Sequence, residues 1–165
     1  MNIPTESRLL LQTIWQIGKN SVPLPEAVRS RLAPYITRYA QTLEMSVYAV
    51  GGTEDHLHIL HNLPLDKPLQ KNLDEIQKAT VRFIREFPET SQFQWADTMW
   101  IATFRAEDRE LLEGYVRENA VRHQTGRIVP EWEGTEFPAD APTDSAEDAL
   151  PDWMREAAHR LSSDS

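Results

Sequence analysis

Apolar residues recur along the first 105 residues with two different periods, which predict the secondary structure. Short runs rich in strand-forming residues predict four β-strands, at 8–17, 46–50, 56–60 and 99–104. Apolar residues three or four positions apart predict two helices, at 26–43 and 68–87. Pro34 interrupts the first helical pattern, so it is expected to kink this helix or divide it in two.

The predicted elements follow the order β-α-β-β-α-β, which is typical of ferredoxin-like sheets. The fold class is therefore α+β, with a four-stranded antiparallel sheet that carries both helices on one face. A further helix is expected over 107–122, with acidic residues early and basic residues late, as the helix dipole favours. It is free to lie on the open face of the sheet. Four residues share one side of this helix at four-residue spacing: Leu111, Tyr115, Asn119 and His123.

Two histidines stand one residue apart in the third predicted strand. Side chains alternate between the faces of a strand, so His56 and His58 share one face. Leu57 and Ile59 share the other face and should contact the two helices, which leaves the histidines on the open side. Two imidazoles about 7 Å apart along a strand can bind one metal ion. The alternative is a hairpin strand whose polar face carries two histidines without a ligand role.

The helix over 107–122 can bring two further groups to these histidines. Asn119 lies one turn beyond Tyr115, so its amide could be a third metal ligand beside the phenol. Imidazole and amide ligands leave coordination positions open, as catalytic metal sites require. A divalent ion can polarise a phosphodiester, and a tyrosine can attack phosphorus to form a covalent ester. Alternatively, Tyr115 is a half-buried packing residue and Asn119 a solvated polar group.

Charge is unevenly distributed and divides the chain into two predicted parts. Residues 129–165 hold ten acidic and two basic residues, whereas residues 1–128 hold sixteen acidic and fifteen basic residues. We therefore predict a folded domain over 1–128 and an acidic, partly disordered tail over 129–165. Within this tail, 131–150 is expected to be extended or loosely ordered, and Pro151–Leu161 can form a short helix.

Two absences in the composition narrow the class of protein. The sequence contains no cysteine, which excludes disulfides and thiolate metal sites. It also contains no apolar run long enough to span a membrane, and its first residues lack the apolar block of a signal peptide. We therefore expect a cytoplasmic protein that does not contact a membrane.

Basic residues gather on the polar side of the helix over 68–87. A near-neutral domain can carry a local basic face of this kind, and the phosphates of a nucleic acid are a natural ligand for it. A charged stripe can equally be a solvated helix face, and Asp74 and Glu75 interrupt its first half. The candidate DNA-binding residues are Lys71, Lys78, Arg82 and Arg85.

Several segments resemble the HUH single-tyrosine transposases, the small insertion-sequence enzymes and their REP-associated relatives. Asp55-His56-Leu57-His58 is similar to their Asp-His-x-His signature, and residues 76–88 resemble their second helix, which ends in Phe-Pro. The segment from Tyr115 to Asn119, followed by His123, is similar to their tyrosine helix. Phe93-x-Trp95 stands where the family has Phe-x-Trp before its last strand.

This resemblance implies a metal-dependent enzyme that cuts and rejoins single-stranded DNA. Tyr115 would be the nucleophile and would form a 5′-phosphotyrosine intermediate. His56, His58 and Asn119 would bind Mg²⁺ or Mn²⁺. The resemblance also implies a homodimer and a DNA substrate that contains hairpins.

The sequence departs from the family pattern in three places. Asn119 stands where the family usually has the longer glutamine, and the usual Gly-Tyr after the Trp motif is replaced around Thr98-Met99-Trp100. The acidic tail is also unusual. Two alternatives therefore stay open: a DNA-hairpin-binding protein of the same fold without efficient cleavage, and an unrelated ferredoxin-like interaction domain.

Overall fold

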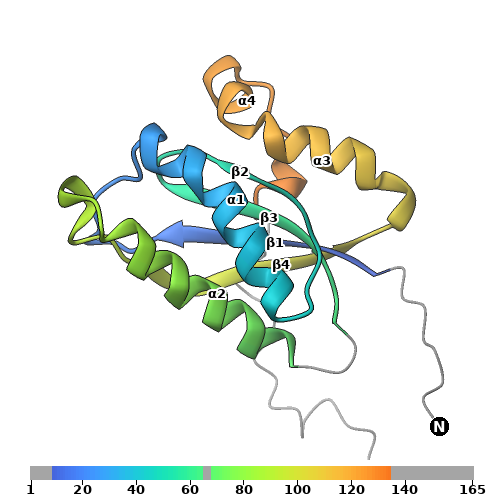
Figure 1. Cartoon of the computed structure of the whole chain (residues 1–165). Coiled ribbons are helices and arrows are strands. Elements are labelled where there is room, and N and C mark those ends of the chain that lie inside the picture. Colours follow the sequence, from blue (N-terminus) through green and yellow to red (C-terminus); the bar gives the residue numbers. More distant parts are fainter. Residues whose placement is uncertain (1–8, 65–67, 135–165) are drawn as a thin grey trace, which may run out of the picture. The chain divides into compact units, whose positions relative to one another are not determined.

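The computed structural model describes residues 9–64 and 68–134 (Figure 1). The strands are β1 (Leu10–Ile17), β2 (Val47–Gly52), β3 (His56–Asn62) and β4 (Trp95–Phe104). The α-helices are α1 (Glu26–Thr42), α2 (Leu69–Ile84), α3 (Arg109–Arg117) and α4 (Asn119–Thr125). Short 3-10 helices span Pro88–Thr90, Ala106–Asp108 and Pro130–Trp132. No helix among the described residues is long and apolar enough to cross a membrane.

The four strands form one antiparallel sheet in the order β2-β3-β1-β4. This order, with α1 between β1 and β2 and α2 between β3 and β4, confirms the predicted ferredoxin-like α+β fold. β3 lies in the interior of the sheet, where His58 is opposite Ile14 of β1 and Gly51 of β2. The histidine pair therefore stands on a strand with a neighbour along each edge.

Helices cover both faces of the sheet (Figure 1). α1 and α2 cover one face, where Leu57 and Ile59 belong to the main hydrophobic core. α3 covers the other face over a smaller core that includes Leu60, Leu112 and Val116. His56 and His58 lie on the α3 face, next to Tyr115 and Asn119, so the predicted alternation along this strand is confirmed.

α1 runs past Pro34 as one helix, so the predicted division of this helix is wrong. Pro34 is exposed, and a buried stripe continues on either side of it through Val28, Leu32, Ile36 and Ala40. Burial of this stripe against the sheet outweighs the one backbone hydrogen bond that proline cannot donate.

The single helix predicted over 107–122 is instead two helices, α3 and α4, which meet at Glu118. Glu118 has φ −91° and ψ 2°, which departs from α-helical values. Leu111 lies one turn before Tyr115 in α3, but it is 61% exposed and does not pack on the sheet. α3 packs on the sheet through residues three and four positions apart, Leu112, Tyr115 and Val116.

Gly51 of β2 determines how closely α3 approaches the sheet. A Cβ atom at this position would lie 1.8 Å from the carbonyl oxygen of Val116 in α3. The backbone of the helix therefore rests directly on the backbone of the strand, which only glycine permits. Because Tyr115 precedes Val116, this contact sets the height of Tyr115 above the sheet.

The chain turns back after α4 and lies beneath α3 (Figure 1). Residues 130–132 form a 3-10 helix, and Trp132 packs against the smaller core. The expectation of loose order from residue 131 is therefore wrong for 131–134. Residues 135–165, with the short helix expected over Pro151–Leu161, lie outside the described residues, and the division at residue 128 stays a prediction.

Candidate metal centre

His56 and His58 lie side by side at the start of β3, with their ring centroids 5.0 Å apart. His56 is 9% exposed and His58 is completely buried. Nδ1 of His56 donates a hydrogen bond to Asp55 (2.6 Å) and lies 2.8 Å from Oγ1 of Thr53. These contacts from the turn before β3 leave a free lone pair on Nε2 of the neutral ring, as in histidines that bind metals.

The structure brings Asn119 and Tyr115 to the two histidines. Oδ1 of Asn119 lies 3.2 Å from Nε2 of His56. The ring centroid of Tyr115 lies 6.4 Å from that of His58. Tyr115 is 1% exposed and Asn119 is fully buried. Four candidate site residues from β3, α3 and α4 therefore converge, and their catalytic and metal-binding roles stay predictions.

Glu133 lies at the centre of this site, and the sequence analysis did not identify it. Its Oε1 accepts hydrogen bonds from the hydroxyl of Tyr115 and from Nδ2 of Asn119, the latter at 3.0 Å. Its Oε2 lies 3.4 Å from Nε2 of His56 and 3.3 Å from Nε2 of His58. Nothing in its sequence context distinguishes Glu133 from the nine other acidic residues of 129–165.

The atoms at the centre of the site fit a divalent cation. Nε2 of His56 carries a lone pair, and it faces oxygen atoms of Asn119 and Glu133 that also carry lone pairs. Nε2 of His58 also faces Glu133, and neither ring nitrogen of His58 makes a hydrogen bond within the described residues. Ligand atoms bound at about 2.1 Å to one ion stand about 3.0–3.4 Å apart. Three separations at this site lie in that range: 3.2 and 3.4 Å from Nε2 of His56 to Asn119 and Glu133, and 3.3 Å from Nε2 of His58 to Glu133.

Three of these residues form a complete ligand group by themselves. His56, His58 and Glu133 each offer one ligand atom, and the three atoms lie within 4.8 Å of one another. Two imidazole nitrogens and one carboxylate are a common set for divalent transition metals and leave further positions open. The structure therefore supports a candidate site for a divalent metal.

Burial and the same contacts shift the pKa values of the site. Burial raises the pKa of Tyr115, and its hydrogen bond to Glu133 raises it further. Burial alone would raise the pKa of Glu133, but its close contacts with His56 and His58 and the hydrogen bond from Tyr115 hold it well below its ordinary value. Burial lowers the pKa of His58, whereas at His56 burial is outweighed by the contact with Glu133 and the hydrogen bond to Asp55, which raise the pKa. The site therefore pairs a neutral phenol with an ionised carboxylate.

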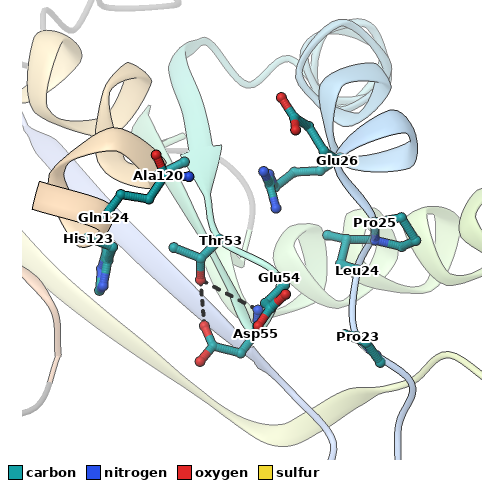
Figure 2. A pocket seen from close by; sticks show the side chains of 11 residues that line it. Pro23, Leu24, Pro25, Glu26, Thr53, Glu54, Asp55, Ala120, His123 and Gln124 are labelled. Carbon is teal, nitrogen blue, oxygen red and sulfur yellow. Dashed lines mark hydrogen bonds between the residues drawn. The ribbon is translucent and has the colours of Figure 1, made fainter.

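His123 stands at the edge of the site, where a pocket opens to solvent (Figure 2). Its Nε2 lies 3.0 Å from Oε2 of Glu133, and its ring centroid lies 4.8 Å from that of His56. The pocket of about 680 Å³ is also lined by residues 23–26, by Thr53 and Asp55, and by Gln124 of α4. Its wall thus includes Asp55 and His123, which both contact the candidate metal centre.

The four candidate DNA-binding residues are exposed on α2. α2 covers the face of the sheet opposite α3, so these side chains lie away from the metal centre (Figure 1). Nε of Arg85 donates a hydrogen bond to the carbonyl oxygen of Phe93 (2.8 Å), which ties α2 to the segment before β4. Within the described residues, Lys71, Lys78 and Arg82 form no ion pair.

Comparison with known proteins gives one family and two related solved structures. Residues 6–119 match the profile of the family described as IS200-like transposases. A candidate transposase from Deinococcus radiodurans R1 superposes with a TM-score of 0.55 at 17% identity, over 72% of this chain and 95% of that chain. A REP-associated tyrosine transposase bound to a REP hairpin superposes with a TM-score of 0.52 at 15% identity, over 78% of this chain and 76% of that chain. At these identities the two structures show a shared fold alone. No curated protein sequence matches the chain.

Proposed function

Because the chain belongs to the family of IS200-like transposases, we propose that it cuts and rejoins single-stranded DNA with Tyr115 as the nucleophile. One observation carries this proposal: the hydroxyl of Tyr115 binds the same carboxylate that faces the two histidines. A phenol beside a cation site is suited to attack on a phosphodiester. Family membership also excludes the unrelated interaction domain considered from the sequence.

His56 and His58 would hold a divalent cation, Mg²⁺ or Mn²⁺, together with the amide oxygen of Asn119. A bound cation would polarise the phosphodiester and neutralise charge that develops during displacement. The hydrogen bond to Asp55 keeps Nε2 of His56 directed at the other candidate metal-ligand atoms. Asn119 is one methylene shorter than the glutamine usual at this position, and the carboxylate of Glu133 adds an oxygen on the same side of the site.

The proposed reaction exchanges one phosphate ester for another. The phenolic oxygen of Tyr115 attacks phosphorus, and the bond between phosphorus and the 3′-oxygen of the preceding nucleotide breaks. The phenol loses a proton and the leaving 3′-oxygen gains one. The products are a 5′-phosphotyrosine and a free 3′-hydroxyl, and attack by another 3′-hydroxyl rejoins the strands.

Exposed basic residues on the helical face would contact DNA phosphates at a distance from the scissile bond. α2 offers Lys71, Lys78, Arg82 and Arg85. α1 adds Arg31 and Arg38, which line a groove with aromatic side chains of both helices. The solved relative that is bound to a REP hairpin supports a hairpin-containing substrate for this chain. A homodimer remains part of the proposal.

Covalent capture of DNA tests the proposed function. The protein is mixed with Mn²⁺ and a pool of random-sequence single-stranded oligonucleotides labelled at the 3′ end, and products are separated on a denaturing gel. We expect a labelled protein band with wild type and none with Tyr115→Phe, since only the attacking oxygen is removed. Cooperative thermal unfolding of Tyr115→Phe serves as the control for folding. A labelled band that persists in this variant would refute the assignment of Tyr115.

A second candidate function is the binding of DNA hairpins without efficient cleavage. The burial of Tyr115 favours it, because the hydroxyl is engaged by Glu133 and by the backbone N–H of Val129. Retention of hairpin DNA with no covalent product, in either Mg²⁺ or Mn²⁺, would support this second function.

A further inference from the structure

Residues 129–134, here called the strap, close over the candidate nucleophile. The backbone N–H of Val129 donates a hydrogen bond to the hydroxyl of Tyr115 (3.0 Å), and the ring of Trp132 meets the Tyr115 ring edge-on at 4.9 Å. Nε2 of Gln12 donates to the carbonyl oxygen of Trp132 (2.7 Å) and so fastens the strap to β1. These contacts leave Tyr115 1% exposed.

A phosphodiester cannot reach Tyr115 while the strap is in this position. The hydroxyl donates a hydrogen bond to Glu133 and accepts one from Val129. Attack requires phosphorus about 3–3.5 Å from the attacking oxygen, along an unobstructed direction. The strap occupies the space in front of the hydroxyl, and the rest of Tyr115 is buried. The strap must therefore move before the proposed reaction can begin.

The carboxylate of Glu133 resembles a phosphate in the chemistry that it offers to a cation held by the two histidines. Oε2 of this carboxylate faces Nε2 of His56 and of His58 at 3.4 and 3.3 Å. A non-bridging oxygen of a phosphodiester is also an anionic oxygen, which divalent cations prefer as a ligand. The carboxylate and the phosphate would therefore compete for one position beside the histidines.

We infer that Glu133 is an exchangeable cation ligand that holds the strap closed over Tyr115 until a phosphate of single-stranded DNA takes its place. The inference rests on the proposed function, because it takes Tyr115 as the nucleophile. It goes further in making one residue outside the family-matched range 6–119 the link between cation binding and access to the nucleophile.

The contacts of the strap suit such an exchange. Apart from Glu133, the contacts of the strap include the half-buried ring of Trp132, the hydrogen bond from Gln12 and the hydrogen bond from Val129 to Tyr115. Gly134 ends it in a left-handed conformation (φ 70°) against the ring of Trp100. Loss of Glu133 from the site would remove the contacts of the strap with His56, His58 and Asn119 together.

The affinity for Mn²⁺ tests the role of Glu133 without any reaction. Titration calorimetry compares wild type with Glu133→Gln, which keeps the size of the side chain and removes its charge. We expect Glu133→Gln to bind Mn²⁺ at least about tenfold more weakly. Glu131→Gln is the matched control, because Glu131 is an exposed acid of the same strap. Equal affinities of wild type and Glu133→Gln would overturn the inference.

Hydrogen exchange reports whether the strap is closed. The backbone amides of Trp132 and Glu133 donate to the carbonyl oxygens of Val129 (2.9 Å) and Pro130 (3.0 Å). We expect Mn²⁺ to slow their exchange in wild type and in Glu131→Gln, but not in Glu133→Gln. Addition of the oligonucleotide pool to the Mn²⁺-loaded wild type should reverse this slowing. Exchange that Mn²⁺ leaves unchanged, or that DNA slows further, would contradict an exchangeable strap.

The rate of covalent capture at saturating Mn²⁺ completes the test. If the strap is closed in about nine of ten molecules, releasing it raises the rate about tenfold. We therefore expect both Glu133→Gln and Trp132→Ala to react faster than wild type, and Glu131→Gln to react like wild type. An unchanged or slower reaction in both variants would overturn the inference. Absence of any covalent product with wild type would instead refute the proposed function, and calorimetry and exchange would still decide whether Glu133 binds the cation.

Discussion

Replacement of Gly51 by alanine should displace the nucleophile without changing any residue of the candidate site. The new Cβ would lie 1.8 Å from the carbonyl oxygen of Val116, and such contacts essentially never fall below 3.0 Å, so α3 must move by about 1.2 Å. The obstructing atoms belong to the backbone of α3 and cannot swing aside as a flexible side chain can. Tyr115 moves with Val116, whereas His56 and His58 stay on β3.

The size of this displacement gives the expected losses. A reacting group misplaced by about 1 Å can slow a reaction on the order of 100-fold. Overpacking of a well-filled contact destabilises a protein by about 1–3 kcal/mol. We therefore expect Gly51→Ala to capture DNA about 100-fold more slowly and to lose a few kcal/mol of unfolding free energy.

Covalent capture at saturating Mn²⁺ and urea unfolding measure the two effects. Gly114→Ala is the matched control, because Gly114 lies in α3 and a methyl group added there would meet no atom within 4 Å. Alanine favours a helix interior over glycine, so this control should keep the wild-type rate and gain about 1 kcal/mol of stability. A Gly51→Ala protein with wild-type rate and stability would refute the argument that Gly51 sets the height of α3.

Two further predictions concern Asp55, which contacts the candidate metal centre, and His61, a buried histidine further along β3. Asp55→Asn should weaken Mn²⁺ binding by about 10- to 100-fold, because it removes the carboxylate that orients His56, while the exposed control Glu54→Gln should bind like wild type in calorimetry. Wild-type affinity of Asp55→Asn would contradict this role. Burial lowers the pKa of His61 from 6.5 to about 4. The unfolded chain therefore takes up this proton first as the pH falls from about 6.5 towards 4, which costs about 3 kcal/mol of stability. Urea unfolding measures how much unfolding free energy is lost between neutral pH and pH 4. This loss should be smaller in His61→Gln than in wild type, and equal losses would disprove the assignment.

Local sequence patterns predicted most of the fold because they depend on one element at a time. The alternation of His56 and His58 with Leu57 and Ile59 assigns their faces from strand geometry alone. The order of elements then placed the histidines on the face of the sheet that the first two helices do not cover. The helix with Tyr115 was left to cover that face. The patterns were wrong where packing competes with local preference. The buried stripe of α1 continues past Pro34, and α3 turns Leu112 instead of Leu111 towards the sheet.

The sequence by itself determined the sheet, its two faces and the residues of β3, α3 and α4 that meet on one of them. Their spacing within a strand or a helix is a local property, so it can be read without the rest of the chain. Only the tertiary structure decided the place of Glu133. It reaches the site because the chain folds back after α4 and Trp132 packs beneath α3, and no periodicity encodes that return. The height of Tyr115 was decided in the same way, by the contact of two backbones at Gly51 and Val116, which exists only once the helix has docked on the sheet.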